Sequence, residues 1–460
     1  MASNNKLKER PNNGVEIMYQ LKHYFSKTML IALLSLLLGF MAVYLTFFFY
    51  IPNHTIFPVI LFPIIGSVGL VVLFLLKWEK LLFLFALSVG FQLNDPSPYE
   101  MMFCLMILLF LVKRIPFNRK MLNNYLFLML FLFVLFGTFS IFFSINIQRG
   151  TAWHLITVYL VLSAFFLVLI IKNEKQLVYF LKGFVVGAIL NSMLGVIGYL
   201  AGKSQGRGNR LEGFFQDPNI FSPFVVIAIM LVIEDSITPS LFKSKLFKFL
   251  SIVLMVGALV LAMSRAGWIN FAIALALYAA VKILKGQLRL GFVIKFILVP
   301  FSVLLSVPFI FPGLNFMNQL KDRTTLQSYD NERFDANYFT LKVAENHPFG
   351  IGPGEITSIY YMDTHNTYLR LFAEYGWFAG IFLMLFFLFL AGVLLKRSLS
   401  HDRGDFNLFL VLLCSLVGTL VNIIVVDALH WRHFWVLIAL CYYLIFFKKE
   451  PSTAIKGEIQ

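Results

Sequence analysis

Residues 376–395 read GWFAGIFLMLFFLFLAGVLL, a run without a single charged side chain. A helix needs about 20 apolar residues to cross the hydrocarbon core of a bilayer, so this stretch has the length of a membrane span. The composition of the whole chain agrees, because 59% of its 460 residues are hydrophobic and only 13% are charged, whereas a soluble domain carries about 25% charged residues. The sequence therefore predicts an all-α polytopic membrane protein.

Apolar runs of this kind recur along most of the chain, and we expect about 12–14 transmembrane helices from them. A basic tail at 1–27 precedes a transmembrane scaffold at 28–200, a second membrane region at 201–447 and a tail at 448–460. The two runs on either side of Asn94-Asp95-Pro96-Ser97-Pro98 are short. The candidate spans are residues 28–50, 57–76, 80–94, 99–112, 122–143, 152–171, 177–200, 220–233, 246–263, 267–284, 292–311, 368–395, 406–426 and 432–447.

The basic residues are distributed unevenly between alternate loops. A net charge of +15 would suit a nucleic-acid-binding protein, but most of the 38 lysines and arginines fall in loops on the side of the N-terminus. Cytoplasmic loops of inner membrane proteins carry such an excess. We therefore expect a multi-pass protein of the cytoplasmic membrane, with both termini inside, the polar loop at 312–365 outside, membrane lipids around it and no nucleic-acid partner.

Arginine predominates among the outer basic residues, whereas lysine predominates inside. A planar guanidinium forms bidentate hydrogen bonds with phosphate and carboxylate groups that an ammonium cannot form. The excess indicates an anion-binding site on the outer face, and pairing with lipid headgroups would account for part of the set. The outer basic residues are Lys203, Lys321 and Lys342, with Arg149, Arg207, Arg210, Arg265, Arg323, Arg333, Arg370 and Arg432.

The polar loop at 312–365 is predicted to contain a helix of its own. From Asn331 onward apolar residues recur at helical spacing, with Asp330 or Asn331 as the N-cap and His347-Pro348 as the end of the pattern. We expect this amphipathic helix to lie against the membrane surface or to cap a cavity. Its apolar face would consist of Phe334, Tyr338, Leu341 and Ala344.

The first of three polar stretches on the outer side runs from Gly202 to Asn219. Its glycines let the backbone approach an anionic group, and Arg207 and Arg210 supply positive charge. Because a charge beside the hydrocarbon core normally has a partner, we favour a ligand-binding role for Arg210. Asp217 stands just before an apolar run and is interpreted as a helix cap rather than a catalytic carboxylate.

The second stretch, Ser264-Arg265-Ala266-Gly267-Trp268, forms a short turn between two spans. The Arg265 guanidinium would lie at interface depth, where it could reach lipid phosphate or bind a ligand, and we favour the ligand.

The third stretch begins with His365-Asn366, where the long loop returns to the membrane. A helix starting near Asn366 would place His365 at its positive end, which lowers the pKa of the imidazole and favours the neutral form. On that helix Arg370 and Glu374 have the spacing of a salt bridge.

The remaining polar residues of the apolar runs receive no chemical role. His154 and Asn191 are interpreted as satisfied or interfacial residues of the scaffold. Asp330-Asn331-Glu332 is the nearest approach to an acidic metal pair on the outer side, but it also fits an exposed helix start, so no metal site is predicted. The cysteines have neither pairable nor metal-ligand spacing; they are Cys104, Cys414 and Cys441.

Taken together, the three stretches resemble the O-antigen ligase/polymerase family. The resemblance covers approximately residues 200–430 and rests on the order of the motifs and on their common outer location. The motifs are Arg210 with Gly213 and Asp217-Pro218-Asn219, then Ser264 to Trp268, then Glu345 to Gly354, and finally His365-Asn366-Thr367-Tyr368 with Glu374 and Gly376.

The resemblance implies a GT-C-like membrane glycosyltransferase. Such an enzyme takes a glycan from undecaprenyl pyrophosphate on the outer face and passes it to a glycan or lipid-linked acceptor, without a cofactor or a metal. Arg210 and Arg265 would then bind the pyrophosphate, and His365 would be the base or would orient the acceptor. The supporting residues would be Arg207, Asp217, Asn219, Asn366, Tyr368 and Glu374.

Three classes of function fit the sequence to different degrees: a glycan transferase that is either a polymerase or a ligase, a transporter, and a peptidoglycan-type polymerase. No residue separates a polymerase from a ligase, but the 53 phenylalanines suggest an AT-rich genome, which by association favours a polymerase of capsule or exopolysaccharide. The alternative is a transporter or flippase of lipid-linked glycans, which would carry charges along its path and internal repeats. The His365-Asn366 motif argues against a peptidoglycan-type polymerase.

Overall fold

The computed structural model describes most of the chain in stretches. These are residues 72–92, 96–116, 124–202, 210–287, 328–402 and 404–446, with single positions at 69, 122, 302, 318, 321, 323 and 325. The predicted span at 28–50, most of that at 57–76, nearly all of that at 292–311, and Arg207 lie outside the described residues. The chain divides into two compact units, Met1–Leu81 and Leu82–Gln460, and every helix from α4 onward belongs to the second.

The described residues form helices and contain no strand, which confirms the all-α prediction. The helices are α3 (Trp78–Ser88), α4 (Pro98–Val112), α5 (Tyr125–Ser140), α6 (Ile147–Ile170), α7 (Glu174–Leu200), α8 (Pro218–Ile237), α9 (Lys245–Leu261), α10 (Arg265–Leu284), α13 (Ser328–Asn346), α14 (Ile356–Ile359), α15 (Thr367–Arg370), α16 (Gly376–Ser400), α17 (Leu408–Asn422) and α18 (Arg432–Phe446). Short 3₁₀ turns lie at Ile141–Phe143 and Gly213–Phe215, and a π-helical turn at Leu371–Tyr375 joins α15 to α16.

Six helical stretches of the described chain are long and apolar enough to cross a membrane. They are Tyr125–Phe143, Ile147–Ile170, Glu174–Leu200, Pro218–Ile237, Arg265–Leu284 and Thr367–Ser400. Three apolar helices, α4, α17 and α18, are shorter. The span predicted at 80–94 is also shorter in the structure, because α3 ends at Ser88 and a turn follows at Val89-Gly90.

Side chains at the helix starts explain where the spans begin. The first N–H groups of a helix lack intrahelical partners, and a preceding Asn, Ser or Asp side chain can accept from them. Asn146 caps α6 in this way and Ser264 caps α10. Ser97 and Glu100 form a full capping box at α4. Asp217 caps α8 by accepting a hydrogen bond from the Asn219 N–H, as the sequence predicted.

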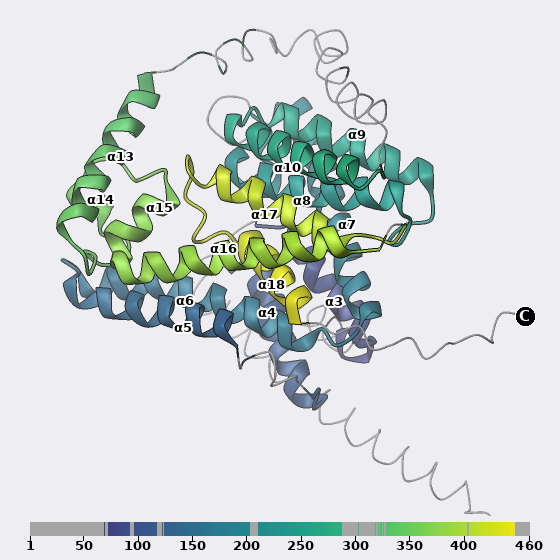
Figure 1. Ribbon diagram of the computed structural model, residues 1–460, viewed down its shortest axis with the longest axis horizontal. Helices are drawn as coiled ribbons and strands as arrows, with labels where there is room; N and C mark the ends of the chain where they lie inside the picture. The colour runs from purple at the N-terminus through teal and green to yellow at the C-terminus, as the bar shows by residue number, and fades with distance from the viewer. Residues whose placement is uncertain are drawn as a thin grey trace, which may run out of the picture. The chain divides into compact units, whose positions relative to one another are not determined.

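Four helices of the second unit, α7, α9, α10 and α17, pack against α8 (Figure 1). Within its membrane-length window 83% of the residues are buried, because α7, α9, α10 and α17 all contact it. A helix that is apolar on every side fits such a central position. On another side α16 packs against α5 and α17, and α13, α14 and α15 gather at one end of this arrangement.

Two lysines for which the sequence predicts inner loops are buried within helices: Lys248 lies near the start of α9 and Lys282 near the end of α10. Lys282 pairs with Glu234 at 2.9 Å, and both side chains are at most 2% exposed. Lys248 pairs with Asp235 at 3.2 Å, and Asp235 also accepts backbone N–H groups from residues 240–242. Such pairs are retained in an apolar interior only when their hydrogen bonds are satisfied.

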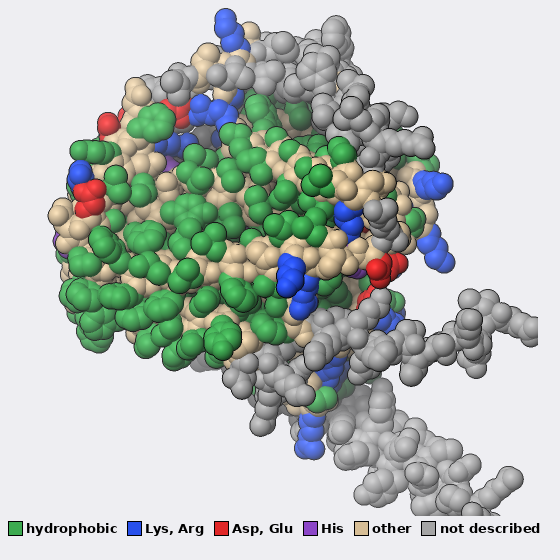
Figure 2. Space-filling model, in the orientation of Figure 1, with side chains coloured by type: hydrophobic (Ala, Val, Ile, Leu, Met, Phe, Trp, Pro, Cys, Tyr) green, Lys and Arg blue, Asp and Glu red, His purple; other side chains and the backbone are tan. Residues whose placement is uncertain are grey.

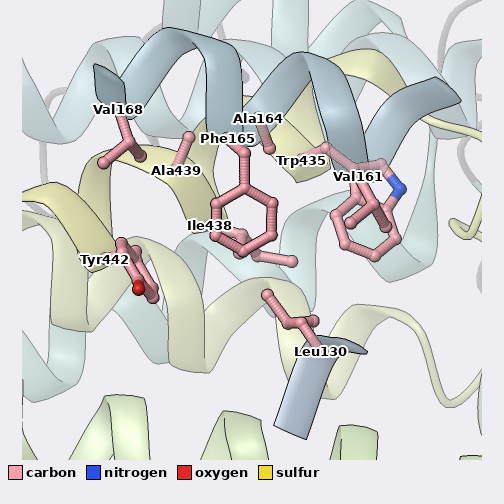
Figure 3. Close-up of a pocket in the computed structure, with 9 residues that line it drawn as sticks. All are labelled: Leu130, Val161, Ala164, Phe165, Val168, Trp435, Ile438, Ala439 and Tyr442. Carbon is pink, nitrogen blue, oxygen red and sulfur yellow. The ribbon is translucent and has the colours of Figure 1, made fainter. Parts of the chain in front are cut away.

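Apolar packing elsewhere leaves little empty space. A narrow cavity between α5, α6 and α18 has a volume of about 10 Å³ (Figure 3), which is about the volume of a single water probe. Its lining is almost entirely apolar, so it offers no polar ligand a place. The lining residues are Leu130, Val161, Ala164, Phe165, Val168, Trp435, Ile438, Ala439 and Tyr442.

Replacing Lys282 by methionine should lower the stability of the folded protein strongly. The change would leave the buried Glu234 carboxylate without its cation, a loss that costs about 3–5 kcal/mol in comparable sites. The melting temperature of the purified protein in detergent micelles would measure the effect. Lys342→Met is the control, because Lys342 and its partner Glu345 are each 49% exposed. Equal melting temperatures for the two variants would contradict a structural role for the Lys282 pair.

Candidate functional site

A cavity of about 590 Å³ lies where the starts of α8 and α10 meet α13. Binding sites for small ligands commonly measure 300–1,000 Å³. Figure 2 shows a hollow near α13, with Lys or Arg side chains and a His side chain gathered at it. The lining residues come from stretches far apart in the sequence: Arg210, Asn219, Met263, Arg265, Ala266, Ile269, Arg323, Asp330, Glu332, Arg333, Phe334, Asn337, Met362, His365, Val425 and Val426.

Hydrogen bonds fix Arg210 at the cavity wall. Its Nε donates to the Ala262 carbonyl at 3.0 Å and its Nη2 donates to Asn219 Oδ1 at 3.3 Å. The same Asn219 oxygen accepts a hydrogen bond from Ser264 Oγ at 2.8 Å. Ser264 caps α10, whose first residue is Arg265. Asn219 therefore links the two arginines that the sequence singled out.

The turn that carries Arg210 is held by Asn191 of α7. Phe214 N–H donates to Asn191 Oδ1 at 3.0 Å, and Asn191 also donates to the Gly90 carbonyl. Gly213 adopts a positive φ of 56°, and a Cβ atom on it would lie 2.0 Å from Asn191 Oδ1. Only glycine fits at this close approach. Asn191 is thus a hydrogen-bonded structural residue that holds the turn carrying Arg210.

Arg265 connects the cavity to α13. Its Nη2 atom lies 2.6 Å from Asp330 Oδ1, and the Arg265 side chain is 34% exposed while Asp330 is 7% exposed. Because α13 begins at Ser328, Asp330 lies inside the first turn and is not the N-cap that the sequence predicted. Its carboxylate orients the arginine instead.

The predicted helix exists, and the larger residues of its predicted apolar face are not covered by protein, so they can still face the membrane surface or the cavity. Phe334, Tyr338 and Leu341 are 40–64% exposed. Of the predicted face only Ala344 is buried, and it packs with Val343 in a cluster with Ile351, with Ile356 of α14 and with Ala373 of the π-helical turn. The small Ala336 and Thr340 are fully buried too. The helix approaches its neighbours closely through small side chains, so the size of the residues, and not only their polarity, selects the buried face.

The cavity is positively charged over its described lining. Four arginines, Arg210, Arg265, Arg323 and Arg333, face two carboxylates, Asp330 and Glu332. All four arginines belong to the predicted outer set, but the sequence motifs indicate only Arg210 and Arg265 as ligand-binding residues. Arg323 and Arg333 could be assigned to the cavity only from the structure, because both come from the polar loop rather than from the two hairpin turns. Guanidinium groups in a recess suit a phosphate ligand.

His365 lines the same cavity and is partly buried. Burial lowers the pKa of its imidazole, the Arg333 charge lowers it further, and Asp427 and Asp217 act in the opposite direction. The lowered pKa agrees in direction with the sequence prediction. Its cause differs, because burial and the Arg333 charge lower the pKa, whereas the sequence predicts an effect of the helix end. The neutral imidazole, which can accept a proton, therefore predominates near neutral pH.

Asn366 and the following residues hold this histidine in place. Asn366 Oδ1 accepts the Tyr368 and Leu369 N–H groups at 3.0 and 3.1 Å, which caps α15. Thr367 N–H donates to the Ile423 carbonyl at 3.0 Å, and Tyr368 Oη donates to the Leu420 carbonyl at 2.7 Å. Asn366 and Tyr368 do not line the cavity, so they support His365 from behind.

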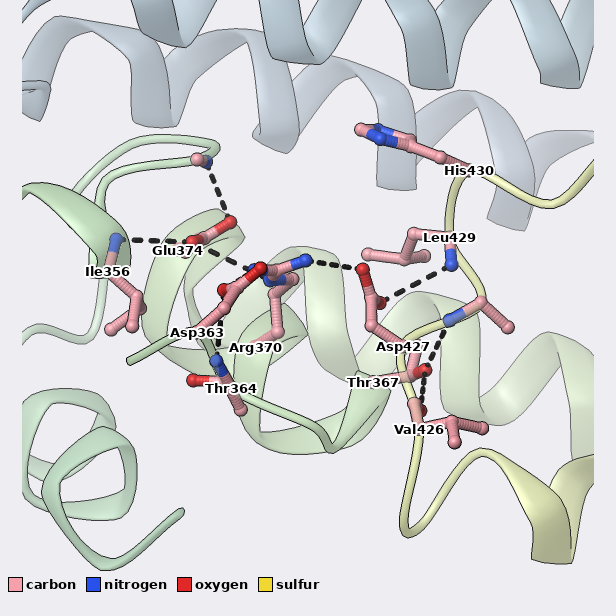
Figure 4. Close-up of polar contacts among 12 residues, drawn as sticks. Ile356, Asp363, Thr364, Thr367, Arg370, Glu374, Val426, Asp427, Leu429 and His430 are labelled. Atoms are coloured by element: carbon pink, nitrogen blue, oxygen red, sulfur yellow. Dashed lines mark hydrogen bonds and ion pairs between the residues drawn. The ribbon is translucent and has the colours of Figure 1, made fainter. Parts of the chain in front are cut away.

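Arg370 forms a buried network beside this helix (Figure 4). Its guanidinium is 3% exposed and pairs with Asp363 and Asp427, while its Nε lies 3.7 Å from Glu374 Oε1. Glu374 also accepts the Gly354 N–H at 2.7 Å and the Ile356 N–H at 3.2 Å. Both residues are engaged within the fold, which confirms the predicted Arg370–Glu374 salt bridge.

Two other outer arginines also have partners in the fold. Arg149 donates to Ser358 Oγ at 2.9 Å and to Thr357. Arg432 pairs with Glu100. These two and Arg370 are three of the eight arginines in the predicted outer set. Each is bonded to protein groups, so lipid headgroups are not needed to explain their presence.

The fold and the cavity define a multi-pass membrane protein with an arginine-rich pocket at one end of its helices. Residues 250–384 match the family model described as O-antigen ligase. The match contains Arg265 and His365 and confirms the resemblance to the O-antigen ligase/polymerase family over this stretch. Among curated proteins no sequence matches the chain.

Gly213→Ala should disrupt the Arg210 turn. The new methyl group would meet Asn191 Oδ1 at 2.0 Å in a backbone of positive φ, so the turn must move. Gly202→Ala is the matched control, since Gly202 also has a positive φ, of 65°, but no atom of the described residues lies within 4 Å of a Cβ there. We expect a clearly lower melting temperature for the Gly213 variant, beyond the strain of about 1–2 kcal/mol that both share. Equal shifts would show that the Asn191 contact does not hold the turn.

Proposed function

We propose that this protein transfers or polymerises an undecaprenyl-pyrophosphate-linked oligosaccharide on the outer face of the cytoplasmic membrane, and that the arginine-rich cavity is its active site. The family match supports a membrane enzyme of the O-antigen ligase/polymerase type. The observation that carries the proposal is the meeting of Arg210, Arg265 and His365 at one cavity. We favour a surface-polysaccharide polymerase over an O-antigen ligase.

In this proposal the arginines bind the pyrophosphate of the donor. The acceptor hydroxyl oxygen attacks the anomeric carbon of the donor sugar, and the bond from that carbon to the pyrophosphate oxygen breaks. The leaving pyrophosphate keeps the electron pair, so negative charge grows at the site during the reaction. Preorganised guanidinium groups stabilise such a charge where water has been displaced. With several arginines at the cavity, the reaction needs neither a metal ion nor a nucleotide sugar.

His365 accepts the proton of the attacking hydroxyl. A general base works best when its pKa lies near or below the operating pH, because it must be unprotonated when the acceptor arrives. Burial and the Arg333 charge lower the pKa of His365 in this sense. Asn366, Thr367 and Tyr368 limit the movement of His365. Asn219 binds Arg210 and Asp330 binds Arg265, so the base and the arginines are held in position for the same transfer step.

Water must be kept away from the activated donor, or hydrolysis would compete with transfer. The cavity has an apolar part as well as a charged one, with Phe334 from α13, Met362, and Val425 and Val426 on the way to α18. We infer that α13 covers the reacting groups. This is one of the two positions that the sequence allowed for the helix.

Charge placement supports the proposed orientation in the membrane. Lys282 and Lys285 lie at the end of α10 opposite Arg265, and Lys248 lies at the end of α9 opposite Ala262, which binds Arg210; an inner face would carry lysine at these ends. The α8 interior from Phe221 to Ile233 has no charged residue. A transporter would place charges along such a path, which is why we favour the enzyme.

His365→Gln should reduce glycan transfer by about 100- to 10,000-fold, the usual effect of removing a general base. The assay uses purified protein in lipid vesicles with labelled undecaprenyl-pyrophosphate glycan, and product length is read on gels. His347→Gln is the control, because His347 lies in the same outer segment, is exposed and does not line the cavity. Full activity of the His365 variant would refute its role as the base, and absence of transfer by the wild-type protein would favour the transporter.

The pH profile should report the environment of His365. Because its pKa is lowered, activity should persist as the pH falls below the usual histidine pKa of about 6.5 and should be lost only when the imidazole is protonated. Arg333→Gln removes one cause of the lowered pKa, so the acid limb of kcat/KM should move to higher pH.

Lys342→Gln is the control for this shift, because it removes a positive charge from the same helix at an exposed position away from the cavity. An acid limb that stays in place in the Arg333 variant, or moves equally in both, would contradict the assignment of the base.

A further inference from the structure

An aromatic stack beside the cavity has no part in the reaction described above. The Phe339 ring of α13 stacks on the Tyr360 ring with centroids 4.5 Å apart and planes at 18°. Tyr361 packs against Tyr360 with centroids 4.6 Å apart. The outermost ring, Tyr361, is 73% exposed, while Phe339 packs against the buried cluster of α13. An exposed ring is thus supported from below by two others.

Carboxylates lie next to this stack. Glu332, Asp335 and Phe339 share one face of α13, because they are spaced by three and four residues. A hydrogen bond with Tyr361, then burial, then the charges of Tyr361, Asp335 and Glu332 raise the pKa of Tyr360 to about 12. The stack therefore combines flat apolar rings with hydroxyl and carboxylate acceptors, the combination that matches a sugar ring with its C–H faces and its hydroxyl groups.

The stack continues directly into the cavity. Met362, the residue after Tyr361, lines the cavity, and so does His365 three residues further on. Glu332 lines the cavity from α13 and also acts on Tyr360. A chain of sugars whose end lies at His365 would therefore meet the tyrosines within a short distance.

The membrane is a poorer occupant for this surface. Carboxylates such as Glu332 and Asp335 are unfavourable in the hydrocarbon region, and they repel the anionic headgroups that a basic surface would attract. A rigid ring that needs no ordering on binding favours association with a specific ligand. These observations select a polyhydroxylated chain over lipid.

We propose that Tyr361, supported by Tyr360 and Phe339 and flanked by Glu332 and Asp335, forms a subsite for the non-reacting sugars of the glycan. This inference rests on the proposed function and adds a second contact to it: the arginines hold the pyrophosphate, while the tyrosines hold the carbohydrate. Each additional repeat on the substrate then strengthens its binding without entering the reaction.

The test compares Tyr361→Ala, Tyr361→Phe and the wild-type protein in lipid vesicles. The substrates are carrier-linked glycans of one and of several repeats, and farnesyl diphosphate, which lacks sugars, is the inhibitor. For the longer glycan Tyr361→Ala should raise KM about tenfold, equivalent to about 1.4 kcal/mol, with little change in kcat and shorter products. Tyr361→Phe, which keeps the ring, should resemble the wild type. Inhibition by farnesyl diphosphate should be equal in all three.

Tyr125→Ala is the matched control, because Tyr125 is 77% exposed at the start of α5, far from α13 in the sequence, and does not line the cavity. An unchanged KM in Tyr361→Ala, or a loss of farnesyl diphosphate inhibition along with it, would overturn the subsite.

Binding of the released, carrier-free oligosaccharide to immobilised protein provides a readout that does not need turnover. If the wild type transfers nothing but binds the oligosaccharide through Tyr361, the proposed reaction fails and the subsite stands. If it transfers glycan and Tyr361→Ala binds the oligosaccharide as tightly as the wild type, the subsite fails and the reaction stands.

Discussion

A single buried guanidinium joins the segments on which the candidate site depends. Arg370 is 3% exposed, and three carboxylates from different parts of the chain surround it: Asp363, Glu374 and Asp427. On a further side its guanidinium lies 5.4 Å from the centre of the Trp153 ring. A charge removed from water this completely is tolerated only when it is paired and hydrogen-bonded. The pairing therefore specifies one arrangement of the loop before α15 and the loop before α18.

The position of His365 follows from this arrangement. The histidine lies between Asp363 and Thr367, and Thr367 is bonded at its N–H and its hydroxyl to the segment at 423–428. Because Val425 and Val426 of that segment line the cavity, the network that buries Arg370 also shapes the cavity wall. Arginines thus have two positions at this end of the molecule: Arg370 organises the loops, and others line the cavity.

Much of the fold could be predicted from the sequence, because the responsible signals are local. Long apolar runs predicted the spans, and capping residues such as Asp217 predicted their starts. The three polar stretches could be grouped because each stands beside apolar runs and the loop charges predict the same side of the membrane for all of them. The short α3 was overestimated, since hydropathy does not register the turn at Val89-Gly90. The roles of the lysines at 248 and 282 were also missed, because their partners lie elsewhere in the chain.

The division of labour among the outer arginines could not be predicted. Arg370, Arg149 and Arg432 look no different from Arg265 in the sequence, and all four are bonded to protein groups, yet of these four only Arg265 also lines the cavity. That distinction depends on which carboxylate or hydroxyl the fold brings near each guanidinium. The residues through which α13 packs against its protein neighbours could not be predicted either, because close packing favours Ala336 and Thr340 over the larger Phe334 and Tyr338. Tertiary contacts decide both outcomes.

The most direct test of a pyrophosphate-binding active site is native mass spectrometry of the purified protein with undecaprenyl diphosphate and undecaprenyl monophosphate. The account predicts a clear preference of the wild type for the diphosphate, and loss of that preference when Arg210 and Arg265 are both replaced by glutamine. Equal binding of the two lipids by the wild type, or an undiminished preference in the double variant, would contradict it.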